Sequence, residues 1–161
     1  MVEKIAREMI LYFGEDVKRI NHALKVYGFC STIAGLEELN ENGRLVVSLC
    51  GLLHDIGIKE AERKYNSSAG TYQEKEGPEI ARRIMEKYDI DTGTIERACF
   101  IIGNHHSYGK IDGIDFQILV EADFIVNIFE DEMEKPAIGS VRGKYFKTRS
   151  GIQLLEAMYL E

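Results

Sequence analysis

The adjacent residues His54 and Asp55 form the pair in this sequence that is best placed to do chemistry. They follow a stretch of nine apolar or small residues, LVVSLCGLL, which predicts that both side chains are buried. Burying an imidazole beside a carboxylate costs free energy unless each group finds a partner, because both lose their contacts with water. A divalent metal ion would satisfy both, since imidazole nitrogen and carboxylate oxygen are common ligands of such ions.

Further residues of the kinds that bind metal ions lie elsewhere in the chain. His22 lies in RINHALKV, Asp123 lies in the apolar stretch VEADFIVN, and the last two histidines are adjacent as His105–His106. One buried histidine is more often a hydrogen-bonded core residue, but here four histidines and two aspartates would need that explanation together. Asp123 is expected in the middle of a helix, where no backbone amide is free for its carboxylate. We therefore predict a metal site formed by residues of this set.

The order His22, His54–Asp55, Asp123 resembles the HD-domain superfamily of metal-dependent phosphohydrolases, over about residues 16 to 127. The resemblance implies an all-helical fold in which His22, His54, Asp55 and Asp123 hold the metal ion. It also implies an enzyme in which metal-activated water attacks a phosphomonoester or a small nucleotide. The alternative is a non-catalytic HD module that binds a metal ion or a nucleotide and has a regulatory or structural role. A purely structural helical adaptor, the third hypothesis, would bind no metal.

The sequence departs from the family's pattern at two places. Members that hold two metal ions commonly carry a histidine between the HD pair and a later His-His pair, and here Glu76 stands at that place, in QEKEGPEIA. Glu76 would either replace that ligand at a second ion or act with His105 as proton carrier and phosphate binder; we favour one ion over two. Many members also have a lysine three residues after the aspartate of the pair, where this chain has Ile58 followed by Lys59.

The same scheme assigns proton carriers and phosphate binders. Glu76 or Asp123 would accept a proton from water, and His105 or His106 would donate one to the leaving oxygen. On a helix, adjacent residues point about 100° apart, so the two histidines of the pair would not both face the ion. The candidate phosphate-binding residues are Arg19, Lys25, Lys59 and Lys110, each of which is otherwise an ordinary solvated charge. The ligand types suit Mn, Fe, Co, Ni, Zn or Mg and do not distinguish among them.

Composition restricts the partners of the protein. The 161 residues are 45% hydrophobic and 29% charged, with a net charge of -7, which is typical of one folded domain. This acidic balance argues against broad binding to nucleic acid or to an anionic membrane, whereas the family resemblance implies a small phosphorylated substrate, possibly a nucleotide. No apolar run approaches the roughly 18 residues needed to span a bilayer, and the N-terminus lacks the apolar core of a signal peptide. We therefore expect a cytoplasmic protein, with its three cysteines reduced and buried.

Helical periodicity runs through the chain, and no stretch shows the alternation of a strand. We expect a compact all-α bundle of about six to eight helices around a central metal site, forming one HD-type domain over 1–161. The core of this domain should span about residues 16–130, with a C-terminal loop and helix at 131–161. The helix over residues 116–130 is apolar around most of its circumference and should be central. Residues 66–77 read as a loop, with Pro78 at the first position of the next helix.

The outer helices offer a further expectation. The first and last helices each have an apolar face that could pair with a second copy of the chain, giving a homodimer. Phosphate-cradling loops of the G-x-x-x-x-G-K-[ST] type and dinucleotide-binding G-x-G-x-x-G motifs do not occur. The metal ion is therefore the single cofactor that the sequence predicts.

Overall fold

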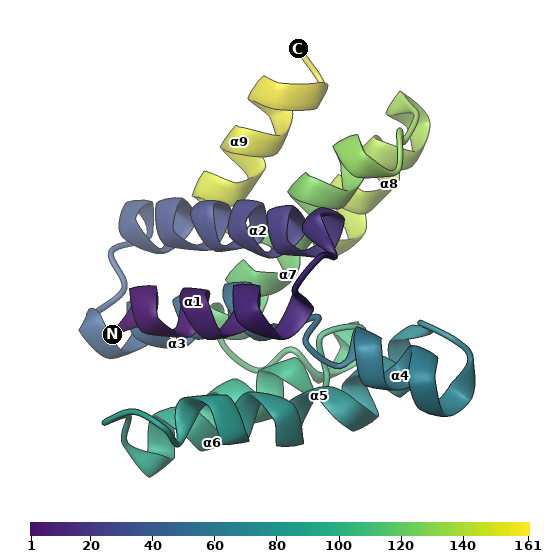
Figure 1. Ribbon diagram of the computed structural model, residues 1–161. Helices are drawn as coiled ribbons and strands as arrows, with labels where there is room; N and C mark the ends of the chain where they lie inside the picture. The colour runs from purple at the N-terminus through teal and green to yellow at the C-terminus, as the bar shows by residue number, and fades with distance from the viewer.

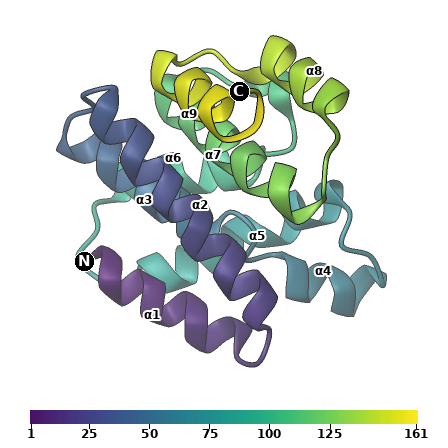
Figure 2. The same ribbon diagram turned by 90° about the horizontal axis from the view of Figure 1, so that it is seen from above.

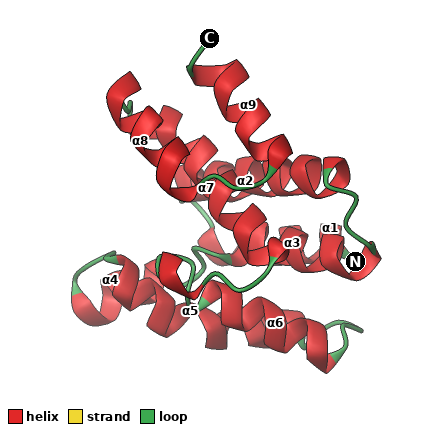
Figure 3. Ribbon diagram, turned by 180° about the vertical axis from the view of Figure 1, so that it is seen from behind, coloured by secondary structure: helices red, strands yellow, loops and turns green.

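Nine α-helices and one turn of 3-10 helix make up the computed structural model, which describes residues 1–161 and contains no β-strand (Figures 1 and 3). The all-α fold predicted from the sequence is confirmed. In chain order the elements are α1 (Val2–Phe13), α2 (Val17–Leu36), α3 (Glu41–Leu53), α4 (Ile58–Tyr65), α5 (Gly70–Met85), α6 (Thr92–Ile102), η1 (Tyr108–Lys110), α7 (Ile114–Glu130), α8 (Lys135–Tyr145) and α9 (Arg149–Tyr159). None of them combines the length and the apolar character that crossing a membrane requires.

Polar side chains set the start of four helices. Asp16, Asn40, Asp91 and Thr148 each accept a hydrogen bond from the backbone amide three residues later, which is the arrangement of a helix N-cap. Gly14 follows the end of α1 with a φ of 61°, a conformation that glycine adopts without steric cost. The chain therefore turns sharply after α1, and α2 returns alongside it (Figure 1).

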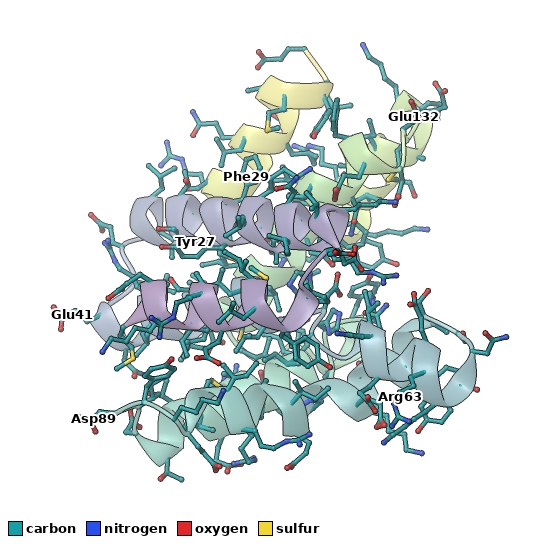
Figure 4. The ribbon with its side chains drawn as sticks, in the orientation of Figure 1. Tyr27, Phe29, Glu41, Arg63, Asp89 and Glu132 are labelled. Carbon is teal, nitrogen blue, oxygen red and sulfur yellow. The ribbon has the colours of Figure 1, made fainter.

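The centre of the fold consists of α2, α3 and α7, which pack on one another (Figures 1 and 2). α1 covers α2 and α3, the pair α5 and α6 packs on the other side of α3, and α8 and α9 extend from α7 at the opposite end of the molecule. Phe116 and Ile118 of α7 are completely buried, in agreement with the apolar circumference of that helix. Charged side chains lie at the outer edges of the molecule, as Figure 4 shows for Glu41, Arg63, Asp89 and Glu132.

A close approach between α2 and α3 brings two of the histidines together. A Cβ atom on Gly51 would lie 2.8 Å from the Cα atom of Tyr27 in α2, so glycine alone fits at this crossing. His54 follows Gly51 by about one helical turn, and its ring centroid lies 5.2 Å from that of His22. The glycine within the apolar stretch is therefore part of what positions the histidines.

The prediction of a loop over residues 66–77 is wrong for most of that range, because residues from Gly70 onward belong to α5. This helix begins at Gly70, so Pro78 lies inside the helix instead of at its first position. Tyr72 stacks on Tyr65 of α4, with ring centroids 4.2 Å apart. Packing against α4 and α6 thus stabilises a helix that the polar, glycine-containing sequence did not indicate.

The C-terminal region differs from its prediction in the same way. Part of the loop expected within 131–161 forms α8, despite the glycines of GSVRGKYFK. Ile138 and Val141 of this helix are buried against the core, and Pro136 lies in its first turn, where its missing amide hydrogen has no cost. Two helices therefore follow α7, where the sequence predicted one.

A buried carboxylate in α7 ties these last two helices to the centre. Glu121 is completely buried, and its oxygens accept hydrogen bonds from the backbone amides of Lys147 (2.9 Å) and Thr148 (3.0 Å). The Thr148 hydroxyl donates at 2.6 Å and the side-chain amide of Gln117 at 2.5 Å. Every neighbour of this carboxylate is a donor, so hydrogen bonds alone satisfy its charge.

Candidate metal centre

The four predicted metal ligands come together between α2, α3 and α7. Nε2 of His22 lies 3.1 Å from Nε2 of His54, 3.1 Å from Oδ1 of Asp123 and 3.3 Å from Oδ2 of Asp55. Nε2 of His54 lies 3.4 Å from each of the same two carboxylate oxygens. The structure therefore brings together side chains that are 101 residues apart in sequence, from His22 to Asp123.

This spacing is that of ligand atoms around one metal ion. With bonds of about 2.1 Å, neighbouring ligand atoms lie about 3.0 Å apart in an octahedral site and about 3.4 Å apart in a tetrahedral one. The five distances in the cluster fall between 3.1 and 3.4 Å. The cluster has the dimensions of a cation site, with two nitrogen and two oxygen donors.

Hydrogen bonds at the far side of each ring direct the free lone pairs into the cluster. Nδ1 of His54 donates to the carbonyl oxygen of Gly51 at 3.0 Å, and Nδ1 of His22 donates to Oε1 of Glu130 at 2.5 Å. Because Nδ1 carries a proton in both rings, Nε2 is the nitrogen that each ring can offer to a metal ion, and the two Nε2 atoms face one another. Such outer partners fix the tautomer and orientation of histidines that bind metal ions. Glu130 was not predicted from the sequence.

The electrostatics of the cluster call for positive charge. Burial would lower the pKa of His54, but Asp55 and Asp123 outweigh it and raise that pKa well above its ordinary value. Burial would raise the pKa of each aspartate, yet His54 above all holds the pKa of both below the usual range. The two aspartates thus favour positive charge at the neighbouring imidazoles, and a divalent ion can supply that charge in place of protons. The residues present fit a divalent metal ion.

A second group of possible ligands adjoins the first through Asp55. Nε2 of His105 lies 3.3 Å from Oδ1 of Asp55 and is a buried atom without a hydrogen-bond partner, while its Nδ1 donates to the carbonyl oxygen of Ile102 at 2.7 Å. Ligand atoms of Asp55, His105 and His106 lie within 4.8 Å of one another. The helical argument that separated the two histidines does not apply, because α6 ends at Ile102 and both follow it in a turn.

Gln73, which the sequence did not indicate, contacts the histidine pair. Its Oε1 lies 3.3 Å from Nε2 of His106, and burial followed by the nearby His105 lowers the pKa of His106 to about 4. Glu76 lies about one turn further along α5, and its carboxylate pairs with Lys64 of α4. No hydrogen bond or ion pair joins Glu76 to the histidines, and its role with His105 stays a prediction.

The candidate phosphate binders are distributed unevenly. Arg19 contacts Asp16 and Glu62 and lines the cavity beside the cluster. The other three do not line this cavity. Lys25 pairs with Glu130 at its edge, Lys59 donates to the carbonyl oxygen of Tyr12, and Lys110 donates to Asn104.

A polar cavity of about 330 Å³ opens onto the cluster. It reaches two of the predicted ligands, His22 and Asp55, and it lies between the start of α2 and the end of α7. Its walls also hold Lys18, Asn127 and Asp131, which the sequence did not mark as functional. Asn127 follows Asp123 by one helical turn. This spacing predicts that the two residues share a helix face, but it does not predict that Asn127 lines a cavity. The full set of lining residues is Asp16, Lys18, Arg19, His22, Asp55, Asn127, Glu130 and Asp131.

Taken together, the fold and the cluster define an all-helical protein whose central helices present two histidines and two aspartates to a common point. A family model described as "HD domain" matches residues 19–144. The chain belongs to the HD-domain family, as the order of these residues predicted.

The fold is also found in a solved structure. The chain is similar to the crystal structure of a predicted HD superfamily hydrolase from an uncultured Thermotogales bacterium, with a TM-score of 0.66 and 21% sequence identity. The likeness covers 97% of this chain and 82% of that one. At this identity it establishes a common fold. Curated proteins gave no match to the sequence.

Proposed function

We propose that this protein is a metal-dependent phosphohydrolase that cleaves a phosphomonoester or a small nucleotide. HD-domain membership supports a metal-dependent hydrolase in general. The observation that carries the proposal is the convergence of His22, His54, Asp55 and Asp123 with the spacing of ligands around one cation. The open polar cavity beside them gives a small substrate access to the same point.

In this proposal those four residues hold one divalent ion. A bound divalent ion lowers the pKa of water and neutralises the charge on phosphoryl oxygens. Glu130 and the Gly51 carbonyl keep the two imidazoles in the tautomer that binds a metal. The second group, Asp55 with His105 and His106, offers room for another ion, and we retain one ion as the proposal.

The remaining steps move protons. The water oxygen forms a bond to phosphorus, the bond between phosphorus and the ester oxygen breaks, and the products are an alcohol and inorganic phosphate. Oδ1 of Asp123 accepts a hydrogen bond from Asn127 at 3.0 Å, whereas Oδ2 makes none and is the atom proposed to take the proton from water. His105 or His106 is proposed to protonate the leaving oxygen. Glu76, bound to Lys64, is the weaker candidate for the base.

The test begins with metal content. Protein purified without chelator should hold about one equivalent of a first-row metal ion by elemental analysis, and a chelator should remove it. Hydrolysis of p-nitrophenyl phosphate should then depend on added Mn²⁺, Co²⁺, Ni²⁺ or Mg²⁺. Bound metal without turnover on this ester or on a nucleotide panel would favour the non-catalytic module. Absence of bound metal with every ion offered would remove the proposal.

Three predictions accompany the proposal without further support. They are the assignment of residues 1–161 to one domain, the cytoplasmic location, and the pairing of outer helices in a homodimer. Sedimentation of the purified chain tests the last of these directly.

A further inference from the structure

The cavity that opens onto the candidate metal centre has an unusual lining for a ligand site. All of its lining residues are polar or charged. Most pockets for small molecules are lined mainly by hydrophobic and aromatic side chains, with a few polar groups that fix orientation. A flat nucleobase would find no apolar surface here, while a ligand covered with hydroxyl groups would find many hydrogen-bond partners.

From this lining we propose that the substrate is a small hydroxylated phosphomonoester, a sugar phosphate or polyol phosphate, bound with its phosphate toward Lys18. This inference rests on the proposed phosphohydrolase function and narrows its substrate class.

Lys18 is the free cation of the cavity. Arg19 is held by Asp16 and Glu62, and Lys25, which lies outside the cavity, is held by Glu130. Lys18 is exposed and makes no ion pair or side-chain hydrogen bond within the chain. An ammonium group without an internal partner can bind an incoming phosphate without first losing a contact. From the sequence, its neighbour Arg19 was the candidate phosphate-binding residue.

The opposite wall supplies acceptors for hydroxyl groups. Asp131 is exposed and its carboxylate makes no ion pair or hydrogen bond. Asn127 uses its amide nitrogen to bind Asp123, which leaves its Oδ1 free. Carboxylate and amide oxygens accept hydrogen bonds from the hydroxyls of a sugar. The same wall, with Glu130, repels additional phosphates, so it disfavours nucleoside diphosphates and triphosphates.

The volume of the cavity also favours a small sugar phosphate or polyol phosphate over a nucleotide. A volume of about 330 Å³ lies at the small end of the range of about 300–1,000 Å³ for ligand pockets. A base attached to the sugar would have to project beyond the polar walls. The cluster of rings formed by Tyr108, Phe124 and Tyr145 does not line this cavity, and its members pack on one another with centroids 4.7 to 5.4 Å apart.

The experiment compares ribose 5-phosphate with adenosine 5′-monophosphate, which carries the same pentose phosphate and a base. With the activating metal present, kcat/KM should be at least about tenfold higher for ribose 5-phosphate, since one unsatisfied or lost polar contact is worth about that factor. Equal or faster hydrolysis of the nucleotide would overturn the inference while leaving the phosphohydrolase intact.

Two variants locate the ligand groups. Lys18→Met should raise KM about tenfold with a smaller change in kcat, because a contact to the phosphate is present throughout the reaction. Asp131→Asn should weaken hydrolysis of ribose 5-phosphate several-fold more than that of p-nitrophenyl phosphate, which has no hydroxyls. Lys144→Met is the matched control, since Lys144 is also an exposed helical lysine without an ion pair but lies outside the cavity. Lys18→Met behaving like Lys144→Met would contradict the assignment.

A binding measurement separates this inference from the function on which it rests. If no ester is hydrolysed, calorimetric titration of the Mn²⁺-treated protein with the same two compounds still ranks them. Tighter binding of ribose 5-phosphate, weakened by Lys18→Met, would support a sugar phosphate as the ligand and reject only the proposed hydrolysis. Tighter binding of adenosine 5′-monophosphate, or binding of neither, would reject the ligand class.

Discussion

Two buried carboxylate clusters, both involving α7, have opposite surroundings. Glu121 is completely buried and receives hydrogen bonds from amides and a hydroxyl. Asp123, two residues later, accepts one hydrogen bond from the side chain of Asn127 and otherwise faces the Nε2 atoms of His22 and His54. Hydrogen bonds from backbone and side-chain donors satisfy the first carboxylate, whereas the second lies against two imidazole nitrogens that can bind either a proton or a metal ion. Burial alone does not indicate a metal ligand; the donor or acceptor character of the neighbours does.

Replacing Asp123 should give the largest effect on metal binding. Asp123→Ala removes one of four converging ligands, so affinity for Mn²⁺ or Co²⁺ should fall by more than about 100-fold. Replacing a residue that only orients a ligand lowers metal affinity by at most about that factor. The thermal midpoint of the metal-free protein should fall by a few degrees near neutral pH, because the histidines lower the pKa of Asp123 and its ionised form therefore stabilises the folded state. Isothermal titration calorimetry and a thermal melt measure the two quantities. Unchanged metal affinity would show that Asp123 is an ordinary buried acid.

Replacing Glu121 should lower the stability of the fold and leave metal binding almost unchanged. Glu121→Ala leaves the amides of Lys147 and Thr148 buried without an acceptor, so unfolding free energy should fall by about 2 kcal/mol. Metal affinity should stay within about twofold, because the side chain makes no contact with the His/Asp cluster. Urea denaturation measures the loss, and Glu121→Gln serves as a control that retains one acceptor oxygen. A large loss of metal affinity without loss of stability would reverse the comparison.

The same pair of residues explains how far sequence reasoning reaches. Asp123 was recognised because its order relative to His22 and His54–Asp55 matches the family's pattern. Glu121 lies in the same apolar stretch, but its amide partners are 26 and 27 residues away, in a connection whose approach depends on the packing of α8. A single sequence does not encode that proximity in any local pattern.

Helix positions were predicted where apolar periodicity was strong and missed where packing supplied the stability. The apolar helix around Phe116 was expected and is central. The helix that begins at Gly70 was not, because polar residues and glycine favour a loop until Tyr72 meets Tyr65. The predicted loop included Glu76, which lies in α5 and pairs with Lys64.

Glu130 links the metal cluster to the molecular surface and should have an intermediate effect. Glu130→Gln weakens the hydrogen bond to Nδ1 of His22, so metal affinity should fall about tenfold. Lys25 contacts the other oxygen of Glu130 at 3.1 Å and is partly exposed, so Lys25→Met is the control and should change affinity by less than about threefold. Calorimetric titration with Mn²⁺ measures both. Equal affinities for Glu130→Gln and the unaltered protein would mean that His22 needs no partner to hold its orientation.

The smallest expected effect is that of replacing Gln73, whose neutral side-chain amide lies beside the second group of possible ligands. Gln73 contacts His106 through Oε1, and its Nε2 donates to the carbonyl oxygen of Ser68 at 2.6 Å. Gln73→His would add an imidazole to the group of Asp55, His105 and His106, so a second, weaker equivalent of Co²⁺ should bind.

Glu76→His is the matched control for this gain, because it places a histidine where the sequence alone suggested a ligand. Its side chain points to Lys64 of α4, so the stoichiometry should stay at that of the unaltered protein. Calorimetry with Co²⁺ counts the ions in both variants. A second ion bound by Glu76→His but not by Gln73→His would mean that the register of α5 relative to the histidine pair differs from the one described. Since the two residues are three positions apart on one helix, they point about 60° apart, and this difference is what directs one toward His106 and the other toward α4.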